Sequence, residues 1–302
     1  SAPHVLVMEV FAHMVVLVLG AAGMLGHRVM RDLAPRYDLV GTVRGPASRY
    51  ADHPVMERMR LLGDVRADDL GSVSDALART RPAAVVNCVG VIKQLPAAKS
   101  PLPAIGINAL FPHQLAQICQ ANNARLIHIS TDCVFSGRKG GYTEDDSSDA
   151  EDLYGRTKFL GEVTGPGCLT LRTSIIGREL SGHVGLLDWF LQQRGRTVRG
   201  YARAIYSGLT TPALARLIGD LLERHPGLEG LWHVSTDPIS KYDLLALLNQ
   251  AFGLGVTIER DESFICDRSL DSDRFRQATG FRPPAWPVMV RELAEDPTPY
   301  ES

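Results

Sequence analysis

The sequence lacks three features, each of which would have indicated a particular class of protein. The first two concern cysteine and charge. Its 302 residues include five widely separated cysteines and no C-x-x-C pair, so neither a disulfide framework nor a cysteine-rich zinc site is expected. Lysine and arginine number 32 against 34 acids, and the net charge of −2 gives no electrostatic reason to bind nucleic acid. We therefore expect free thiols, a cytoplasmic location and no nucleic-acid partner.

A long uninterrupted apolar run is the third missing feature. The most apolar stretch lies near the N-terminus, where Glu9 and His13 interrupt it. It falls short of the roughly 20 apolar residues of a membrane helix, and no basic segment precedes it, as a secretory signal would require. Because His13-Met14 resembles a cloning junction, we interpret residues 1–13 as a vector-derived or natural extension without function, and we expect no membrane partner.

Short β-branched runs alternate with helical patterns from Met14 onward. The runs are almost continuously apolar, which is typical of strands covered on both faces by helices. The alternation predicts an α/β fold with a doubly wound parallel sheet. The predicted strands are Val15–Gly20, Tyr37–Val43, Met59–Asp64, Ala83–Gly90, Arg125–Thr131, Cys168–Ser174 and Gly230–Thr236.

The composition changes after about residue 175. Gly, Pro and Arg become more frequent there, and isolated amphipathic helices replace the regular alternation. We therefore expect one domain over residues 14–175 and a smaller one over residues 176–302, with the strand at 230–236 returning to the sheet.

A glycine-rich segment, Gly20-Ala21-Ala22-Gly23-Met24-Leu25-Gly26, directly follows the first predicted strand and opens a helix. Glycine lets the backbone turn tightly and approach a pyrophosphate, which then lies at the positive N-terminus of the helix. The segment therefore predicts a dinucleotide site.

Two residues at strand ends bear on which dinucleotide binds. Arg44 follows the second predicted strand, where an NAD enzyme would place an acid for the ribose 2′-hydroxyl. A guanidinium there suits a 2′-phosphate instead, so we predict NADP(H) in preference to NAD(H). Asp64 closes the third predicted strand, where its carboxylate would accept from the adenine amine or act as a cap or turn residue.

Thr131, Tyr154 and Lys158 form the strongest candidate constellation. Tyr154 and Lys158 lie four residues apart on a predicted helix and so share one face. The ammonium is expected to lower the pKa of the phenol from about 10, which makes it a proton donor to a developing alkoxide. Thr131, at the end of the fifth predicted strand, would hydrogen-bond the same oxygen.

These motifs, with Asn87-Cys88-Val89-Gly90, Ser130-Thr131-Asp132-Cys133-Val134-Phe135 and Leu171-Arg172-Thr173-Ser174, resemble the extended short-chain dehydrogenase/reductases. Within them the chain most resembles the dTDP-4-dehydrorhamnose reductase branch. The resemblance implies NADPH-dependent reduction of the 4-keto group of a nucleotide-activated 6-deoxy sugar in surface glycan biosynthesis. It also implies an NADP-binding Rossmann domain, a substrate-binding domain and a nucleotide-sugar substrate, and it leaves a homodimer open.

The resemblance carries over residue by residue. It makes Thr131, Tyr154 and Lys158 the catalytic set and gives Asn108 a role in supporting the active-site helix. The residues that it implies for cofactor binding are Gly20, Gly23, Met24, Leu25, Gly26, Arg44, Asp64, Val65, Asn87, Cys88, Val89, Tyr154, Lys158 and Arg172.

The chain departs from the branch at Cys133, where those reductases usually have tyrosine. A cysteine there resembles the GDP-4-keto-6-deoxymannose epimerase/reductases, whose second epimerisation residue is a histidine in a segment like Gly182-His183-Val184. A bifunctional 3,5-epimerase/4-reductase using Cys133 and His183 is therefore one alternative. The other reading makes Cys133 a small apolar filler and His183 a loop residue. The candidate substrate contacts are Cys133, His183, Arg203 and Ser207.

Two further alternatives stay open at this point. The chain could be a catalytically silent nucleotide-binding regulatory subunit, because a fold does not establish an activity. The acidic run Glu144–Asp152 would be a place for Mg²⁺, although no ligand spacing there demands a metal. We predict no protein-bound metal centre and interpret the run as a solvated loop.

Overall fold

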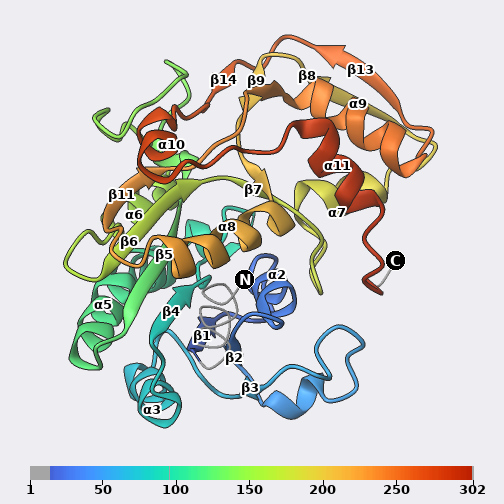
Figure 1. Ribbon diagram of the computed structural model, residues 1–302. Helices are drawn as coiled ribbons and strands as arrows, with labels where there is room; N and C mark the ends of the chain where they lie inside the picture. Colours follow the sequence, from blue (N-terminus) through green and yellow to red (C-terminus); the bar gives the residue numbers. More distant parts are fainter. Residues whose placement is uncertain (1–13, 95, 301–302) are drawn as a thin grey trace, which may run out of the picture.

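The computed structural model describes residues 14–94 and 96–300, so the predicted N-terminal extension lies outside the described residues. Its centre is a seven-stranded sheet with the order β11-β6-β5-β4-β1-β2-β3, in which all neighbours are parallel (Figure 1). The doubly wound α/β fold is thereby confirmed. The strands are β1 (Val15–Leu19), β2 (Asp38–Thr42), β3 (Leu61–Leu62), β4 (Ala84–Asn87), β5 (Arg125–Thr131), β6 (Cys168–Thr173) and β11 (Gly230–His233).

Helices cover both faces of this sheet, because successive strand side chains point to opposite sides. Val16 and Val18 pack with the apolar faces of α2 and α8, whereas Leu17 and Leu19 pack with those of α3 and α5. The continuous apolar runs therefore reflect burial on both sides. These helices are α2 (Gly26–Leu33), α8 (Thr211–Arg224), α3 (Leu70–Thr80) and α5 (Phe111–Ala121).

The strand order reverses between β1 and β4, since β2 and β3 continue to one side and β5 and β6 to the other. In open α/β sheets a ligand binds outside the carboxyl ends of the strands at such a switch point. The segments that follow β1, β2, β4 and β5 all lie at this edge because the strands are parallel. The predicted glycine loop and Thr131 therefore share one end of the sheet.

The later part of the chain builds a second group of small sheets and helices (Figure 1). The core that contains α8 continues into α9 and α11 through Leu244, Leu248 and Met289, so one apolar cluster joins both groups. Strand pairs here are β8 (Thr197–Tyr201) with β13 (Thr257–Asp261), β9 (Ala204–Tyr206) with β12 (Ile239–Ser240) and β14 (Cys266–Asp267), and β7 (Ile175–Ile176) with β10 (Leu209–Thr210). The helices are α7 (Leu186–Leu191), α9 (Lys241–Phe252), α10 (Asp273–Thr279) and α11 (Trp286–Ala294).

Shorter elements connect the strands of the large sheet. The connecting elements are η1 (Ala47–Tyr50), η2 (Pro96–Lys99), α4 (Pro101–Ala104), the π-helical η3 (Ile105–Leu110), η4 (Asp132–Val134) and α6 (Leu153–Leu160).

In residues 14–94 and 96–300, no helix is long and apolar enough to span a membrane.

Candidate active site

The glycine loop has the backbone that a phosphate-binding turn needs. Gly20 adopts φ +80°, a conformation that side chains disfavour. A Cβ on Gly26 would lie 2.1 Å from the Gly20 carbonyl oxygen, so only glycine allows the start of α2 to approach the end of β1. In the described part of the chain, the amides of Met24 and Leu25 donate to no backbone carbonyl. This geometry fits the pyrophosphate of a dinucleotide at a helix N-terminus.

The turns after β2 and β3 meet beside the glycine loop. Asp64, at φ +58°, donates its amide to the Gly45 carbonyl at 2.9 Å, and Val65 donates to Val43 at 3.1 Å. Arg44 is exposed and forms no salt bridge with a described carboxylate. Sequence reasoning missed Arg49, whose guanidinium lies about 3.5 Å from the Cβ position of Gly45. Two arginines therefore stand in the turn that follows β2.

The end of β4 forms the other wall of the switch point. Asn87 is buried, and its side-chain oxygen accepts from the Val89 amide at 3.1 Å while its nitrogen lies 3.1 Å from His128. A Cβ on Gly20 would touch Val89 at 3.2 Å, so this turn packs directly on the glycine loop. Cys88 lies between Asn87 and Val89 in this turn, and burial raises the pKa of its thiol to about 12.

Asn108 supports this wall from the π-helical segment η3. Its side chain accepts from the Val91 amide at 2.8 Å and donates to the Val91 carbonyl at 3.0 Å. A Cβ on Gly161 would collide with the Asn108 carbonyl, so the end of α6 packs closely on η3. The side chain of Asn108 thus fixes the loop after β4, and its backbone meets α6. A π-helical turn is frequent at functional sites.

The three predicted catalytic residues converge at the end of β5. Asp152 caps α6 by accepting from the Gly155 amide at 2.7 Å, which places Tyr154 and Lys158 on the helix face toward β5. The Thr131 hydroxyl lies close enough to the Tyr154 phenol to offset part of the rise in its pKa, and the Lys158 ammonium donates to the Ile129 carbonyl at 2.8 Å. A phenol and a hydroxyl therefore lie at the end of β5, and the ammonium lies on the same face of α6, close enough to Cys88 after β4 to act on its thiol.

The pKa of Tyr154 corrects one sequence prediction. Burial raises it well above its usual value, the charges of Cys133 and Asp132 add to the rise, and the Thr131 hydrogen bond offsets part of it. Lys158 is turned toward the Ile129 carbonyl, and burial lowers the pKa of its ammonium to about 8. At neutral pH the phenol is thus fully protonated and the lysine charged, which still provides a proton donor.

Arg172, which the resemblance implies for cofactor binding, lies in a buried ion pair. Its guanidinium donates twice to the Glu162 carboxylate, both at 2.7 Å, and its third nitrogen lies 3.2 Å from His233. Both side chains of the ion pair are almost fully buried, with exposures of 3% and 6%. The guanidinium is thus held by internal contacts, and its role in cofactor binding stays a prediction.

The four candidate substrate residues differ in their burial and their surroundings. Cys133 lies at the site, where its amide donates to Thr131 at 3.1 Å and burial raises the pKa of its thiol to about 12. Ser207 is buried and accepts from the Leu270 amide at 3.0 Å. His183 is a loop residue at φ +49°, 3.9 Å from the Asp188 carboxylate. Arg203 is exposed between β8 and β9.

Three charged residues near the catalytic set escaped sequence reasoning. Asp132 is buried and accepts from the Thr131 hydroxyl at 3.2 Å. Lys241 and Arg268, from the second group of elements, act electrostatically on Asp132, and the Arg268 guanidinium donates to the Phe135 carbonyl at 2.7 Å. Both cations lie more than 100 residues from Asp132 in the sequence, and no local pattern signals that they meet there.

The acidic run before α6 is used for internal contacts. Asp149 accepts from Ser136 and Asp146 from Lys139, while Asp152 caps α6 and pairs with Lys93. Glu144 accepts from the His233 amide at 2.8 Å. Across the described ranges, no three His, Cys, Asp or Glu side chains gather as a metal site would require.

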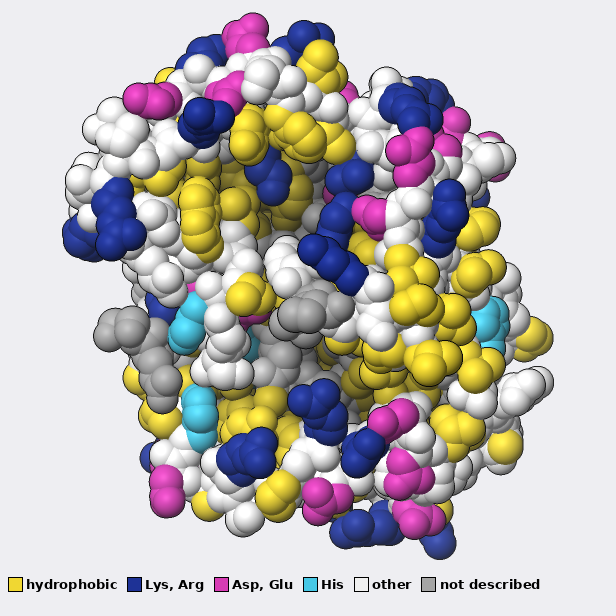
Figure 2. Space-filling view, turned by 180° about the vertical axis from the view of Figure 1, so that it is seen from behind, with side chains coloured by type: hydrophobic (Ala, Val, Ile, Leu, Met, Phe, Trp, Pro, Cys, Tyr) yellow, Lys and Arg dark blue, Asp and Glu magenta, His cyan; other side chains and the backbone are white. Residues whose placement is uncertain are grey.

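The space-filling view adds the shape of one face (Figure 2). This face is hollowed in its upper half, where hydrophobic side chains and Lys or Arg side chains border the hollow. A mixed apolar and cationic lining is suited to a ligand that has both a ring system and phosphates.

Comparison with known proteins identifies the family. The model of the RmlD substrate binding domain matches residues 14–254. A dTDP-4-dehydrorhamnose reductase of Streptomyces griseus is 37% identical over 147 residues, which are 48% of this chain and 43% of that protein. A probable dTDP-4,6-dihydroxy-2-methyloxan-3-one 4-ketoreductase of Streptomyces antibioticus is 31% identical over 238 residues, 72% of this chain and 70% of that protein.

Solved structures agree on the fold. A dTDP-4-dehydrorhamnose reductase from Bacillus anthracis str. Ames, solved in complex with NADP, has a TM-score of 0.76 and 23% identity, and the match covers 93% of this chain and 98% of that one. The chain spans less than half the length of the first curated relatives that it matches. With the family model covering most of its residues, the chain belongs to the RmlD substrate binding domain family.

Proposed function

We propose that this protein is an NADPH-dependent reductase of the 4-keto group of a nucleotide-activated 6-deoxy sugar. The observation that carries the proposal is the convergence of Thr131, Tyr154 and Lys158 beside the glycine loop. The names of the relatives, which are dTDP-sugar reductases, support the substrate class. A cytoplasmic role in surface glycan synthesis, with residues 14–175 binding NADP and residues 176–302 binding the sugar nucleotide, completes the proposal.

The cofactor would be held by the segments that follow β1 and β2 and by α6. The glycine loop would take the pyrophosphate, Arg44 the 2′-phosphate and Lys158 the nicotinamide ribose. When bound, NADPH supplies the hydride that is added to carbon 4 of the sugar. Because an exposed guanidinium binds a phosphate dianion and offers nothing to a neutral diol, Arg44 would favour NADPH over NADH.

The protein residues would manage the proton and the position of the ketone. Tyr154 would transfer its phenolic proton to the oxygen on carbon 4 as the hydride arrives, so that the ketone becomes a hydroxyl group. Since burial raises the pKa of Tyr154, the phenol carries this proton throughout the neutral range. Thr131 would orient the same oxygen by a hydrogen bond, and positioning of this kind lowers the entropic part of the barrier.

We further propose reduction without epimerisation. A thiolate is needed to abstract a proton beside the ketone, and the raised pKa of Cys133 keeps its thiol protonated at neutral pH. His183 contacts Asp188 instead. The alternative of a silent regulatory subunit is disfavoured by the intact set of Thr131, Tyr154 and Lys158.

The test is to incubate the protein with NADPH and a panel of 4-keto-6-deoxy sugars that are linked to dTDP, UDP or GDP. We expect NADPH oxidation with at least one member of the panel and an alcohol at carbon 4 of the product. If NADPH binds but no panel member is reduced, the silent-subunit alternative replaces this proposal.

A further inference from the structure

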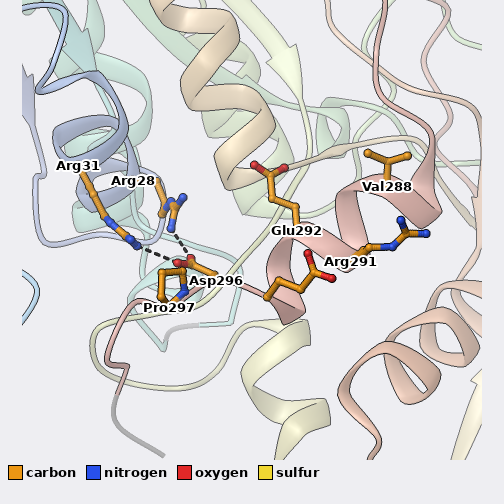
Figure 3. Close-up of a pocket in the computed structure, with 8 residues that line it drawn as sticks. Arg28, Arg31, Val288, Arg291, Glu292, Asp296 and Pro297 are labelled. Atoms are coloured by element: carbon orange, nitrogen blue, oxygen red, sulfur yellow. Dashed lines mark hydrogen bonds and ion pairs between the residues drawn. The ribbon is translucent and has the colours of Figure 1, made fainter.

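The segment Asp296–Tyr300, which we call the C-terminal clasp, packs on the helix that follows the glycine loop. Arg28 and Arg31 of α2 both form ion pairs with Asp296, the second at 2.9 Å (Figure 3). The side chains of Arg28 and Asp296 are each only 8% exposed. The clasp is therefore attached to α2 by largely buried charges.

The clasp also fixes its own shape and presents Tyr300. The Asp296 carboxylate accepts from the Thr298 amide at 3.0 Å and from the Thr298 hydroxyl at 2.5 Å, and the Tyr300 amide donates to the Thr298 carbonyl. The Tyr300 ring lies edge-on to His27, and the Arg178 guanidinium lies 4.8 Å from the ring centroid. Tyr300 thus joins α2 to the loop after β7.

A hydrogen-bond chain leads from the clasp into the glycine loop. The Tyr300 hydroxyl lies 2.8 Å from His27 Nε2, and His27 Nδ1 lies 2.9 Å from the Gly23 carbonyl oxygen. A carbonyl oxygen only accepts, so Nδ1 carries the proton and Nε2 must accept from the phenol. The Arg28 guanidinium lies close enough to the Tyr300 phenol to offset part of the rise in its pKa. His27 is fully buried, and burial lowers its pKa to about 4, so the ring is neutral and its tautomer is set.

The direction of the Gly23 carbonyl matters for the dinucleotide. In a trans peptide the carbonyl and the following amide point in opposite directions. The Gly23 carbonyl accepts from the His27 main-chain amide at 3.1 Å as well as from its imidazole. With both bonds holding it toward His27, the Met24 amide points away from the body of α2, toward the place where a helix N-terminus receives a phosphate. We propose that Tyr300, acting through His27, is a positioning residue that aims the Gly23–Met24 peptide at the dinucleotide pyrophosphate. This inference rests on the proposed dinucleotide site.

The cavity beside the clasp is not needed for this role. It has a volume of about 410 Å³ and lies between α2 and α11 (Figure 3). Three arginines and three acids line it, so it carries no excess charge that would select a ligand. We assign the clasp to loop positioning and assign no ligand to the cavity.

The test compares Tyr300→Phe with the matched control Tyr201→Phe, which removes an exposed phenol hydroxyl on β8. Tyr300→Phe keeps the ring and removes only the hydroxyl that donates to His27. We expect its Kd for NADPH and its Kd for NADH to rise by the same factor, about 3- to 10-fold, because both cofactors share the pyrophosphate. The thermal midpoint without nucleotide should change little, and the amides of residues 23–26 should exchange hydrogen faster. Tyr201→Phe should match the parent in all these measurements.

Two results would overturn the inference. One is a Tyr300→Phe protein whose cofactor Kd values and loop exchange equal those of the parent. The other is a lowered thermal midpoint with unchanged Kd values, which would make the clasp a purely structural contact. Asp296→Asn offers a second variant, since weaker pairing with Arg28 and Arg31 should raise both Kd values together. A parent protein that binds neither NADPH nor NADH would contradict the proposed function itself, and the inference would fall with it.

Discussion

Two buried polar clusters stand near the ends of neighbouring strands, and they differ in how their charges are matched. At β6, the Arg172 guanidinium is paired twice with Glu162, which also accepts from Ser130 at 2.7 Å. At β5, the Lys158 ammonium has the Ile129 carbonyl as its hydrogen-bond partner, and its pKa is lowered to about 8. The first cluster is complete within the protein, whereas the second contains a buried cation without an ion-pair partner among the described residues.

The difference separates structural from functional burial. A buried ion pair with good geometry holds its surroundings in place, and removal of one partner leaves an uncompensated charge. A buried cation with a shifted pKa and no ion-pair partner, offset only by a more distant carboxylate as Glu162 does for Lys158, is typical of a site that a ligand completes. Arg172 and Lys158 look equivalent in the sequence, as basic residues in motifs of one family. Their partners, not their motifs, distinguish them.

The largest effect is expected when the Arg172–Glu162 pair is broken. Arg172→Leu should lower the free energy of unfolding by about 3–5 kcal/mol, because Glu162 would remain buried without its partner. Lys158→Met should not lower stability at neutral pH, because it removes a buried charge that desolvation disfavours, but it should abolish most cofactor binding and turnover. Denaturant unfolding and NADPH titration of both variants measure the contrast. Equal stability losses for the two variants would show that the clusters do not differ as we describe.

The next effect concerns the phosphate end of the cofactor site. Arg44→Ala should lower the preference for NADPH over NADH by roughly 10- to 100-fold, since charge-assisted hydrogen bonds contribute about 1.5–3 kcal/mol each. Arg66→Ala is a matched control, because Arg66 is exposed nearby but already paired with Asp68 at 2.7 Å. The ratio of the two Kd values is the measurement. An unchanged ratio in Arg44→Ala would remove Arg44 from the site.

The pH dependence of the free energy of unfolding and of NADPH affinity tests the lowered pKa of Lys158. Its folded-state pKa, about 8, lies below the usual value of 10.5, so the folded chain loses this proton before the unfolded chain does as pH rises. The free energy of unfolding should therefore gain a contribution between about pH 8 and 10.5. NADPH affinity should fall over the same window because the ammonium is lost. In Lys158→Met both changes should disappear, and their persistence there would assign them to another group.

The smallest effect is expected at Cys133. Cys133→Ser should keep most of the reductase activity, because the protonated thiol performs no proton transfer in the proposed reaction. In deuterated water, the product should carry no deuterium at carbon 3 or carbon 5 beyond a control without enzyme. Enzyme-dependent deuterium at either carbon, lost in Cys133→Ser, would instead support the bifunctional epimerase/reductase.

Local sequence predicted the parts of the site that one strand, loop or helix builds alone. The glycine loop follows β1 directly, and Tyr154 and Lys158 share a face of α6 because they are four residues apart. The pairing of Arg172 with Glu162 was missed, since it depends on how β6 packs against the end of α6. The direction of the Tyr154 pKa shift was also missed, because burial comes from tertiary packing.

Contacts between distant segments were beyond the reach of sequence patterns. Lys241 and Arg268 approach Asp132 only because the second group of elements folds over the end of β5. Tyr300 meets His27 across 273 residues of sequence. Neither contact leaves a spacing or a periodicity in the chain, so both required the three-dimensional arrangement.

The most direct test of the central claim follows the hydride and the proton together. The protein is incubated with NADPH that carries deuterium at the transferable position of the nicotinamide and with the 4-keto sugar nucleotide that it reduces. We predict one deuterium at carbon 4 of the product, and a turnover lower by about 10²-fold or more in Tyr154→Phe with NADPH affinity retained. A Tyr154→Phe protein with near-normal turnover, or a product without deuterium at carbon 4, would contradict the account.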